Sequence, residues 1–471
     1  MTEISGEDFK QKITSNEKSF SDLTIKIEHK TILQMQSLNF ELTFKNVIFK
    51  GESLVFHDRN SEDPLNRFCV FDNCTFFCDI LFSSCSFKYL KFISSKINNK
   101  SFQIANCKVE NLLFEENNEN FTDIIPTIVE SGYLKINGGK IRTIDIENII
   151  FNNGSLGISN LNYTESCSII KSTLNTVVFT HCIFNSYFHY IGNKVISNAN
   201  KCFFNHCNFS SSSFFETNFN DDTHFNNCTF NNPINFQSIN NEINGNFRFT
   251  SCDFTKFTDF DKSKIHKIKL DKIKFHDFVS FQETYFDIIE IDKTNFEKGA
   301  FFDDIQIKKI EDCNRRTIRT IKQQLQKAEN RIDFNRFRAY ELAAHYKELD
   351  WKWNSGFIDK SILYVTKIST DFGNSWRKAL RFTIVSGFLI YLILYFIENR
   401  NFLIDFLNWD NWARLFSGFF RFLLVTDFYN PLETDRVYLT NPFSWLIFIF
   451  GKIVIAFGIY EMIQSFRKFK A

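Results

Sequence analysis

The sequence predicts a solenoid followed by α-helices, two of which are long and apolar enough to cross a membrane. Three observations carry this prediction. Phenylalanine accounts for 61 of the 471 residues and recurs every five residues over much of the chain. The apolar period becomes helical after residue 311, and two long apolar segments lie nearer the C-terminus. A fixed short period is typical of solenoids, in which each repeat buries its apolar residue only by stacking on its neighbours.

We expect three domains. Residues 1–310 form the solenoid, with an N-terminal cap at residues 5–14. Residues 311–355 form a helical connector that also caps the other end of the solenoid, and residues 356–471 form a membrane module. Residues 1–310 carry 38 acidic and 32 basic side chains, whereas the rest of the chain carries 16 acidic and 23 basic ones. A basic excess is expected of a region that touches a membrane surface.

The predicted core of the solenoid is a ladder of apolar residues five apart, with a slip of one residue between Phe219 and Phe225, and most of them are preceded two positions earlier by a small residue. Its clearest members are Phe204, Phe209, Phe214, Phe219, Phe225, Phe230, Phe281, Phe286, Phe296 and Phe301. The small residue is a cysteine at Cys69, Cys74, Cys85, Cys182, Cys202, Cys207, Cys228 and Cys252. Free cysteine behaves as a small apolar residue and is often buried. We interpret these cysteines as reduced core residues, which favours a cytosolic compartment.

Four segments give the ladder a recognisable unit. They read FDNCTF at 71–76, FNHCNF at 204–209, FNNCTF at 225–230 and FTSCDF at 249–254. This unit resembles that of the pentapeptide-repeat proteins, over about residues 40–305. The resemblance implies a right-handed, four-sided (quadrilateral) β-helix with one pentapeptide on each side, in which the small residue and the phenylalanine point inward.

The segment from Asn314 to Trp353 has a helical period instead. Its apolar residues are three and four apart, with basic residues on the other faces: Ile318, Ile321, Leu325, Ala328 and Ile332. We expect either a helical hairpin, whose second helix starts near Asp333, or one continuous helix.

The membrane module contains two predicted spans, at about 379–398 and 442–463, and between them a shorter apolar segment at about 411–426. The shorter segment is suited to a re-entrant or interfacial helix. Basic residues precede the first span and follow the second: Arg377, Lys378, Arg381, Arg467, Lys468 and Lys470. Because basic flanks stay on the cytoplasmic side, we expect both termini in the cytoplasm.

Three segments near the C-terminus extend the resemblance. LDWKWN at 349–354, DFGNSW at 371–376 and YEMIQSFRKFK at 460–470 resemble the tail of bacterial membrane-anchored pentapeptide-repeat proteins. Some of these proteins carry a two-span, ion-channel-like module. The resemblance implies a location in the bacterial inner membrane. Glu461 and Ser465 stand where the usual ending of the family has glutamine and alanine.

The ionisable residues of the membrane module are the candidate pore or subunit-contact residues, namely Lys452, Arg421, Asp427 and Glu461. Lys452 lies near the middle of the second span, where an ionisable group rarely faces lipid. The alternative is that Lys452 pairs with Asp427 or Glu461 or faces another helix. The VTDFYNP segment at 425–431 differs from the filter whose carbonyl groups coordinate potassium.

The solenoid offers little for catalysis or metal binding. The sequence has no Gly-rich phosphate loop, nucleophile elbow or zinc-protease motif, so we expect neither an enzyme nor a cofactor. His181 and His206 each precede a cysteine of the small-residue position. Because adjacent residues of a strand project to opposite sides, a shared metal site is disfavoured and no bound metal is expected.

The sequence thus predicts a non-enzymatic membrane protein. Its β-helix docks an unknown protein partner, and its membrane module associates into a homo-oligomer, since two spans alone cannot enclose a water path. The oligomer is expected to form a channel-like or pore-forming module. The alternative is a membrane-anchored scaffold or interaction protein without conductance. Some pentapeptide-repeat proteins mimic DNA, but 38 acidic against 32 basic residues is too mild an imbalance for that role. No nucleic-acid partner is expected.

Overall fold

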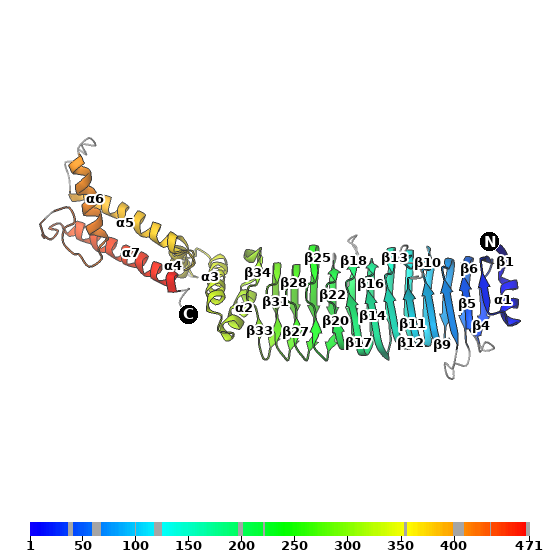
Figure 1. Ribbon diagram of the computed structural model, residues 1–471. Helices are drawn as coiled ribbons and strands as arrows, with labels where there is room; N and C mark the ends of the chain where they lie inside the picture. The colour runs from blue at the N-terminus through cyan, green and yellow to red at the C-terminus, as the bar shows by residue number, and fades with distance from the viewer. Residues whose placement is uncertain are drawn as a thin grey trace. The chain divides into compact units, whose positions relative to one another are not determined.

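The structure is a computed structural model that describes residues 1–35, 41–58, 67–98, 100–116, 125–195, 201–219, 222–352, 356–398, 409–433 and 435–467. The chain divides into two compact units, Met1–Thr317 and Ile318–Ala471. The first is a parallel β-solenoid of about 12 turns, and the second is helical (Figure 1). The basic residues Lys468 and Lys470, used above to predict topology, lie outside the described residues.

The strands of the solenoid pair in parallel with strands of neighbouring turns, in the register typical of Phe209 beside Phe230. In chain order they are β1 (Thr2–Ser5), β2 (Ser19–Ser21), β3 (Leu23–Ile27), β4 (Thr31–Gln34), β5 (Glu41–Lys45), β6 (Ile48–His57), β7 (Phe68–Asp72), β8 (Thr75–Ser83), β9 (Ser86–Ile93), β10 (Lys96–Ile97), β11 (Lys100–Glu115), β12 (Ile128–Glu147), β13 (Ile150–Ser159), β14 (Thr164–Ile170), β15 (Thr173–Leu174), β16 (Thr176–Thr180), β17 (Ile183–Ile191), β18 (Lys194–Val195), β19 (Cys202–Asn205), β20 (Asn208–Ser213), β21 (Asn218–Phe219), β22 (Thr223–Asn226), β23 (Thr229–Phe230), β24 (Ile234–Asn235), β25 (Asn240–Thr250), β26 (Asp253–Phe254), β27 (Thr258–Asp259), β28 (Lys264–Asp271), β29 (Lys274–Phe275), β30 (Val279–Ser280), β31 (Tyr285–Asp292), β32 (Asn295–Phe296), β33 (Ala300–Phe301) and β34 (Gln306–Ile307).

The core residues of successive turns align in four columns, one for each side of the solenoid. The first column contains Phe204, Phe225 and Phe249, the second Phe209, Phe230, Phe254, Phe275 and Phe296, the third Phe214, Phe236, Phe260, Phe281 and Phe302, and the fourth Ile265, Phe286 and Ile307. Rings in the second column stack with centroids 4.6 to 5.3 Å apart. This spacing follows from the separation of paired strands, about 4.8 Å.

One member of the predicted ladder is wrong. Phe301 is only partly buried and stacks on Phe278 outside the core, with ring centroids 5.3 Å apart. Phe302 is buried instead, 5.0 Å from Phe281 in the third column. The step from the second to the third column takes six residues here, as it does from Phe275 to Phe281, so a strict period of five reaches the wrong residue. The other nine predicted members are buried.

The small residues stand just after the corners of the solenoid, and their side chains bond the preceding turn. The Cys228 thiol donates to the Phe204 carbonyl at 3.2 Å, and the Thr284 hydroxyl donates to the Phe260 carbonyl at 3.0 Å. Asn227, at the corner before Cys228, has a left-handed backbone with φ 50°. Asparagine tolerates this conformation better than most residues. The position after each corner therefore favours a small side chain that can donate a hydrogen bond, either a thiol or a hydroxyl.

All 12 cysteines are buried and free, including the eight that were predicted as core residues. Burial raises the pKa of the Cys74 thiol to about 12. A thiol with so high a pKa stays protonated at neutral pH and is a poor nucleophile. The cysteines are therefore packing residues of the solenoid.

The N-terminal end of the solenoid is capped by α1 (Gly6–Thr14) (Figure 1). The Ser5 hydroxyl accepts the backbone N–H of Asp8 and so begins the helix. Phe9 is fully buried, with its ring centroid 5.2 Å from that of Phe20. The predicted cap at residues 5–14 is therefore present, and it covers apolar rings and strand edges that an open end would expose.

The last turn of the solenoid meets a short 3₁₀ helix, η2 (Ile310–Asp312), and the first turn of α2 (Arg315–Lys327). The Thr317 hydroxyl accepts the Ile291 N–H at 2.8 Å and lies 3.3 Å from the Ile291 carbonyl oxygen. The Thr317 side chain thus bonds the backbone of Ile291, which has no further strand to pair with.

The helical unit begins with the rest of α2 and with α3 (Arg331–Glu348). The two helices settle the open alternative in favour of a hairpin. Asn330 ends the turn between them by accepting the Asp333 N–H with its side chain. Glu341 of α3 pairs with Arg319 and Lys322 of α2 at 2.8 and 2.5 Å, which holds the hairpin together.

Four further helices follow: α4 (Phe357–Thr370), α5 (Trp376–Glu398), α6 (Trp409–Leu423) and α7 (Pro442–Arg467). α5 and α7 run side by side, with α4 near one end of the pair and α6 near the other (Figure 1). α5 and α7 are long and apolar enough to cross a membrane. Only 22% of the most apolar 18-residue stretch of α5, and 33% of that of α7, is buried. A core helix of a soluble protein would be mostly buried. These helices cover the two predicted spans, and α6 covers most of the predicted shorter segment.

Candidate functional site

α6 packs against both long helices, near one end of the pair, in a buried apolar cluster. Its Phe419 and Phe422 contact Tyr391 of α5 and Phe448 of α7. Gly418 allows the close approach, since a Cβ there would lie 2.2 Å from the Tyr391 hydroxyl oxygen. Small residues commonly let membrane helices approach in this way.

Lys452 of α7 is held at the C-terminal end of α6. Its Nζ donates to the Phe422 carbonyl at 2.9 Å and to the Leu424 carbonyl at 2.6 Å. It also lies 5.2 and 4.9 Å from the ring centroids of Phe422 and Phe448. The last carbonyl groups of a helix have no partner within the helix and carry partial negative charge, which suits an ammonium group. We refer to this arrangement of Lys452, Phe422, Leu424 and Phe448 as the Lys452 clasp.

The clasp decides among the alternatives left open for Lys452. In the described part of the chain no ion pair joins Lys452 to Asp427 or Glu461, whereas a helix partner, the other form of that alternative, is present in α6. The side chain is only 5% exposed. Its donors are directed at carbonyl groups of the same subunit, and this alone accounts for a lysine in mid-span. Its suggested role at a pore or subunit contact stays a prediction.

Arg421 and Asp427 stabilise the loop after α6. The Arg421 Nε lies 3.7 Å from an Asp427 carboxylate oxygen, and the same guanidinium group donates to the Glu433 carbonyl. The other Asp427 oxygen accepts the Tyr429 N–H at 3.1 Å. The charges of Arg421 and Asp427 therefore offset one another within the loop.

Glu461 lies elsewhere on α7. Its carboxylate accepts the Thr370 hydroxyl at 2.9 Å, and that hydroxyl oxygen accepts the Gly373 N–H at 2.9 Å. Glu461 thus ties α7 to the corner between α4 and α5, beside a polar cavity of about 280 Å³ also lined by Arg338 and Gln464. Nine residues of helix, about 13 Å, separate Glu461 from Lys452. The four predicted residues therefore form two separate sites.

α4 is a helix that was not among the predicted elements. Its apolar residues Ile358, Ile362, Val365 and Ile368 are spaced four, three and three apart and are 40 to 72% exposed. Lys360 and Lys367 lie on a different face, 5.2 and 4.8 Å from the Tyr346 ring centroid of α3. The helical spacing was visible in the sequence. An exposed apolar stripe on a helix with basic residues on another face is typical of helices that lie in a membrane interface.

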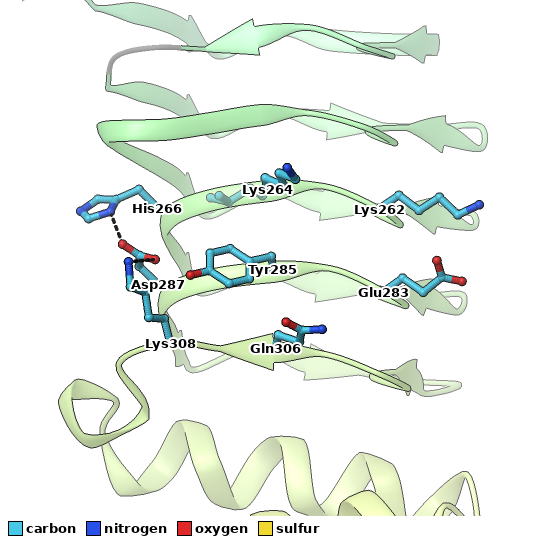
Figure 2. A pocket seen from close by; sticks show the side chains of 9 residues that line it. Lys262, Lys264, His266, Glu283, Tyr285, Asp287, Gln306 and Lys308 are labelled. Atoms are coloured by element: carbon cyan, nitrogen blue, oxygen red, sulfur yellow. Dashed lines mark hydrogen bonds and ion pairs between the residues drawn. The ribbon is translucent and has the colours of Figure 1, made fainter.

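The solenoid has an open groove on its outer face near the C-terminal turns, with a volume of about 620 Å³. Figure 2 shows its polar side chains on three successive turns: Lys262, Lys264, His266, Glu283, Tyr285, Asp287, Gln306 and Lys308. His266 pairs with Asp287 at 2.9 Å, and Lys308 lies 4.0 Å from the same carboxylate. The groove therefore presents both basic and acidic side chains around Tyr285. Sequence reasoning missed it, since these residues occupy ordinary outward positions of the repeat.

The histidines considered for metal binding lie at left-handed corners. The rings of His181 and His206 stack with centroids 4.8 Å apart, whereas Cys182 and Cys207 are buried inside. The side chains thus point to opposite sides of the wall. Among the residues that the structure describes, no group of three or more His, Cys, Asp or Glu side chains is arranged to hold a metal ion.

Comparisons with known proteins add no relative. A scan against protein-family models, a search of curated proteins and a search of solved structures each found no match.

Proposed function

We propose that this chain is a non-enzymatic pentapeptide-repeat protein anchored in a bacterial inner membrane, with a β-solenoid that docks a protein partner and a helical module that forms homo-oligomers. The proposed membrane anchor is supported by one main observation. Many apolar side chains of α5 and α7 are exposed and only 22% and 33% of their most apolar windows are buried, which suits a lipid environment. The partner and the oligomer are supported by the outer groove of the solenoid and by the two-span architecture.

Both termini lie in the cytoplasm under this proposal. Arg377, Lys378 and Arg381 lie in the first turns of α5, and the end of α7 is adjacent, since Trp376 stacks on Phe466 with centroids 5.5 Å apart. Reporter enzymes fused before Met1 and after Ala471 are expected to read as cytoplasmic, and one inserted after Leu432 as external. A reporter after Ala471 that reads as external contradicts the two-span topology.

The groove in Figure 2 is the proposed docking surface for the protein partner. Its mixed charges around Tyr285 suit a polar protein surface better than a strongly charged polymer. A photo-crosslinking amino acid at Tyr285 is expected to yield one defined adduct in cells. The same amino acid at Tyr163, which is exposed outside the groove, is the matched control. Equal adducts from both positions, or none from Tyr285, count against docking at the groove.

Conductance separates the two forms of the proposal. We favour a scaffold without conductance, because Lys452, Arg421 and Asp427 already have partners within one subunit. The channel-like form is supported by α6, a short helix that lies between the two spans in the sequence, as a pore helix does, and packs against both of them. Oligomeric state in mild detergent and single-channel recording on the same sample test both. If the protein is a monomer, both the channel and the proposed homo-oligomer are excluded. If it is an oligomer that gives unitary currents, the scaffold without conductance is excluded.

A further inference from the structure

An open apolar groove lies where α4 meets the first half of α5. It has a volume of about 350 Å³ and is lined by the apolar side chains of Ile368, Phe382, Val385 and Leu389. Val385 and Leu389 are 56% and 55% exposed, and Ile368 is 48% exposed. The groove is therefore an apolar surface that the described residues leave uncovered.

Two basic residues line the same groove at its α5 N-terminal end. They are Lys378 and Arg381, whereas Leu389 lies eight residues after Arg381, about 12 Å along the helix. Lys378 also forms an ion pair with Asp371, with its Nζ 3.0 Å from a carboxylate oxygen. Arg381 makes no ion pair with another described residue and is exposed. The groove thus has a cationic end and an apolar length, which is the arrangement of charge and apolar surface in an anionic phospholipid.

The surroundings of the groove also fit a lipid. Ile368 is the last residue of the exposed apolar stripe on α4, and Val385 and Leu389 belong to the outward apolar face of α5. The groove is thus continuous with the surface that the proposed membrane anchor turns toward the bilayer. A protein partner would have to displace lipid from both helices to reach it.

We propose that this groove binds one anionic phospholipid, with its phosphate at Lys378 and Arg381 and an acyl chain along Ile368, Val385 and Leu389. The inference rests on the proposed membrane anchor and adds a lipid class and a site to it. The bound lipid fills the space between α4 and α5 and so fixes α4 in the membrane interface. Basic side chains near an anionic lipid surface and buried acyl carbons both contribute to such binding.

The test uses the full-length protein in nanodiscs of phosphatidylcholine with a minor fraction of phosphatidylglycerol. Native mass spectrometry then measures which lipid stays bound. The wild type is expected to retain phosphatidylglycerol in preference to phosphatidylcholine. The double variant Lys378→Gln/Arg381→Gln is expected to lose this preference by about tenfold. Arg377→Gln is the matched control, because Arg377 carries the same charge on the same turn but does not line the groove.

A second variant tests the apolar part of the site. Val385→Trp places a bulky side chain in the groove at a position exposed enough to accept it, and it is expected to reduce lipid retention with both cations intact. Retention unchanged in the double variant overturns the site, and so does an equal loss in Arg377→Gln, which would indicate general surface charge. Crosslinks between two copies at position 385 would show that a second subunit covers the groove, and they overturn it as well.

Alkaline carbonate extraction separates this proposal from the membrane anchor on which it rests. Wild-type protein that stays in the membrane pellet but retains no phosphatidylglycerol overturns the lipid site alone. Wild-type protein released into the supernatant overturns the anchor and the lipid site together.

Discussion

The two units of this chain arrange apolar and polar side chains in opposite ways. In the solenoid, phenylalanines such as Phe209 and Phe230 are at most 1% exposed and polar residues occupy the outer wall. In the pair α5 and α7, Leu389 and Leu446 are 55% and 66% exposed, whereas Lys452 is nearly buried. A polar group facing lipid has no water to bond, so it is turned inward to a protein partner. The comparison teaches that burial of an apolar residue can be judged only against the medium around its unit.

The largest expected effect tests the solenoid half of the comparison with two neighbouring residues. Phe302→Ala empties a position in the third column and is expected to lower the free energy of unfolding by about 3–5 kcal/mol. Phe301→Ala removes an outer ring of the same size and is expected to have a much smaller effect. Thermal and chemical denaturation of the full-length protein, followed by loss of β-structure, measure both. Equal losses would mean that the chain does not step six residues there.

The next effect concerns the buried cation of the helical unit. Lys452→Leu leaves the carbonyls of Phe422 and Leu424 without their donor, and it is expected to destabilise the helical unit by about 1–3 kcal/mol. Hydrogen exchange of the amides around α6 should quicken. Lys452→Arg retains donors and should be milder.

The adjacent residue provides a control for the Lys452 clasp. Ile453 is 61% exposed on the outward side of α7, so Ile453→Leu should leave hydrogen exchange in α6 unchanged. If the Lys452→Leu variant proves as stable as the parent, the clasp does not stabilise α6, and Lys452 needs another explanation.

A smaller effect is expected at the other buried polar pair of α7. Thr370→Val removes the hydroxyl that bonds Glu461 and should destabilise the corner between α4 and α5 by about 1 kcal/mol. Glu461→Gln retains an acceptor oxygen and should cost less. A double-mutant cycle on detergent-solubilised protein measures the coupling. Additive effects of the two substitutions are incompatible with a direct bond.

The smallest effect is a pH dependence on the polar wall of the solenoid. His276 lies 3.0 Å from Glu297 and 2.7 Å from Asp253, and the hydrogen bond to Glu297, with help from Asp253, raises the pKa of its imidazole. A raised folded-state pKa gives stability that is fully present below the unfolded value of about 6.5 and is lost as pH rises through the folded value. Melting temperatures across this range should fall slightly for the wild type, and His276→Asn should remove that component. A variant with the same pH profile as the wild type would exclude His276 as its source.

The repeat made the solenoid predictable to single residues. The inward positions of Phe204 to Phe230 follow from the spacing of phenylalanine in the sequence, in which the six-residue step from Phe219 to Phe225 is visible. The prediction for Phe301 was wrong because the chain takes six residues from the second column to the third at that corner, and a constant period of five does not predict the extra residue. The spans α5 and α7 followed from apolar length. The partners of Lys452 did not, because backbone carbonyls at a helix end have no signature in the sequence.

The left-handed corners of the solenoid have a consequence for how this protein can diverge. A corner constrains a backbone angle, and residues as different as His206, Asn227, Glu283 and Lys293 satisfy it in this one chain. Substitutions at corners can therefore alter the outer wall turn by turn while the columns inside stay intact. Surfaces of this kind permit rapid evolutionary change of binding specificity on an unchanged frame. Orthologous chains should accordingly differ most at the residue that precedes each small core position.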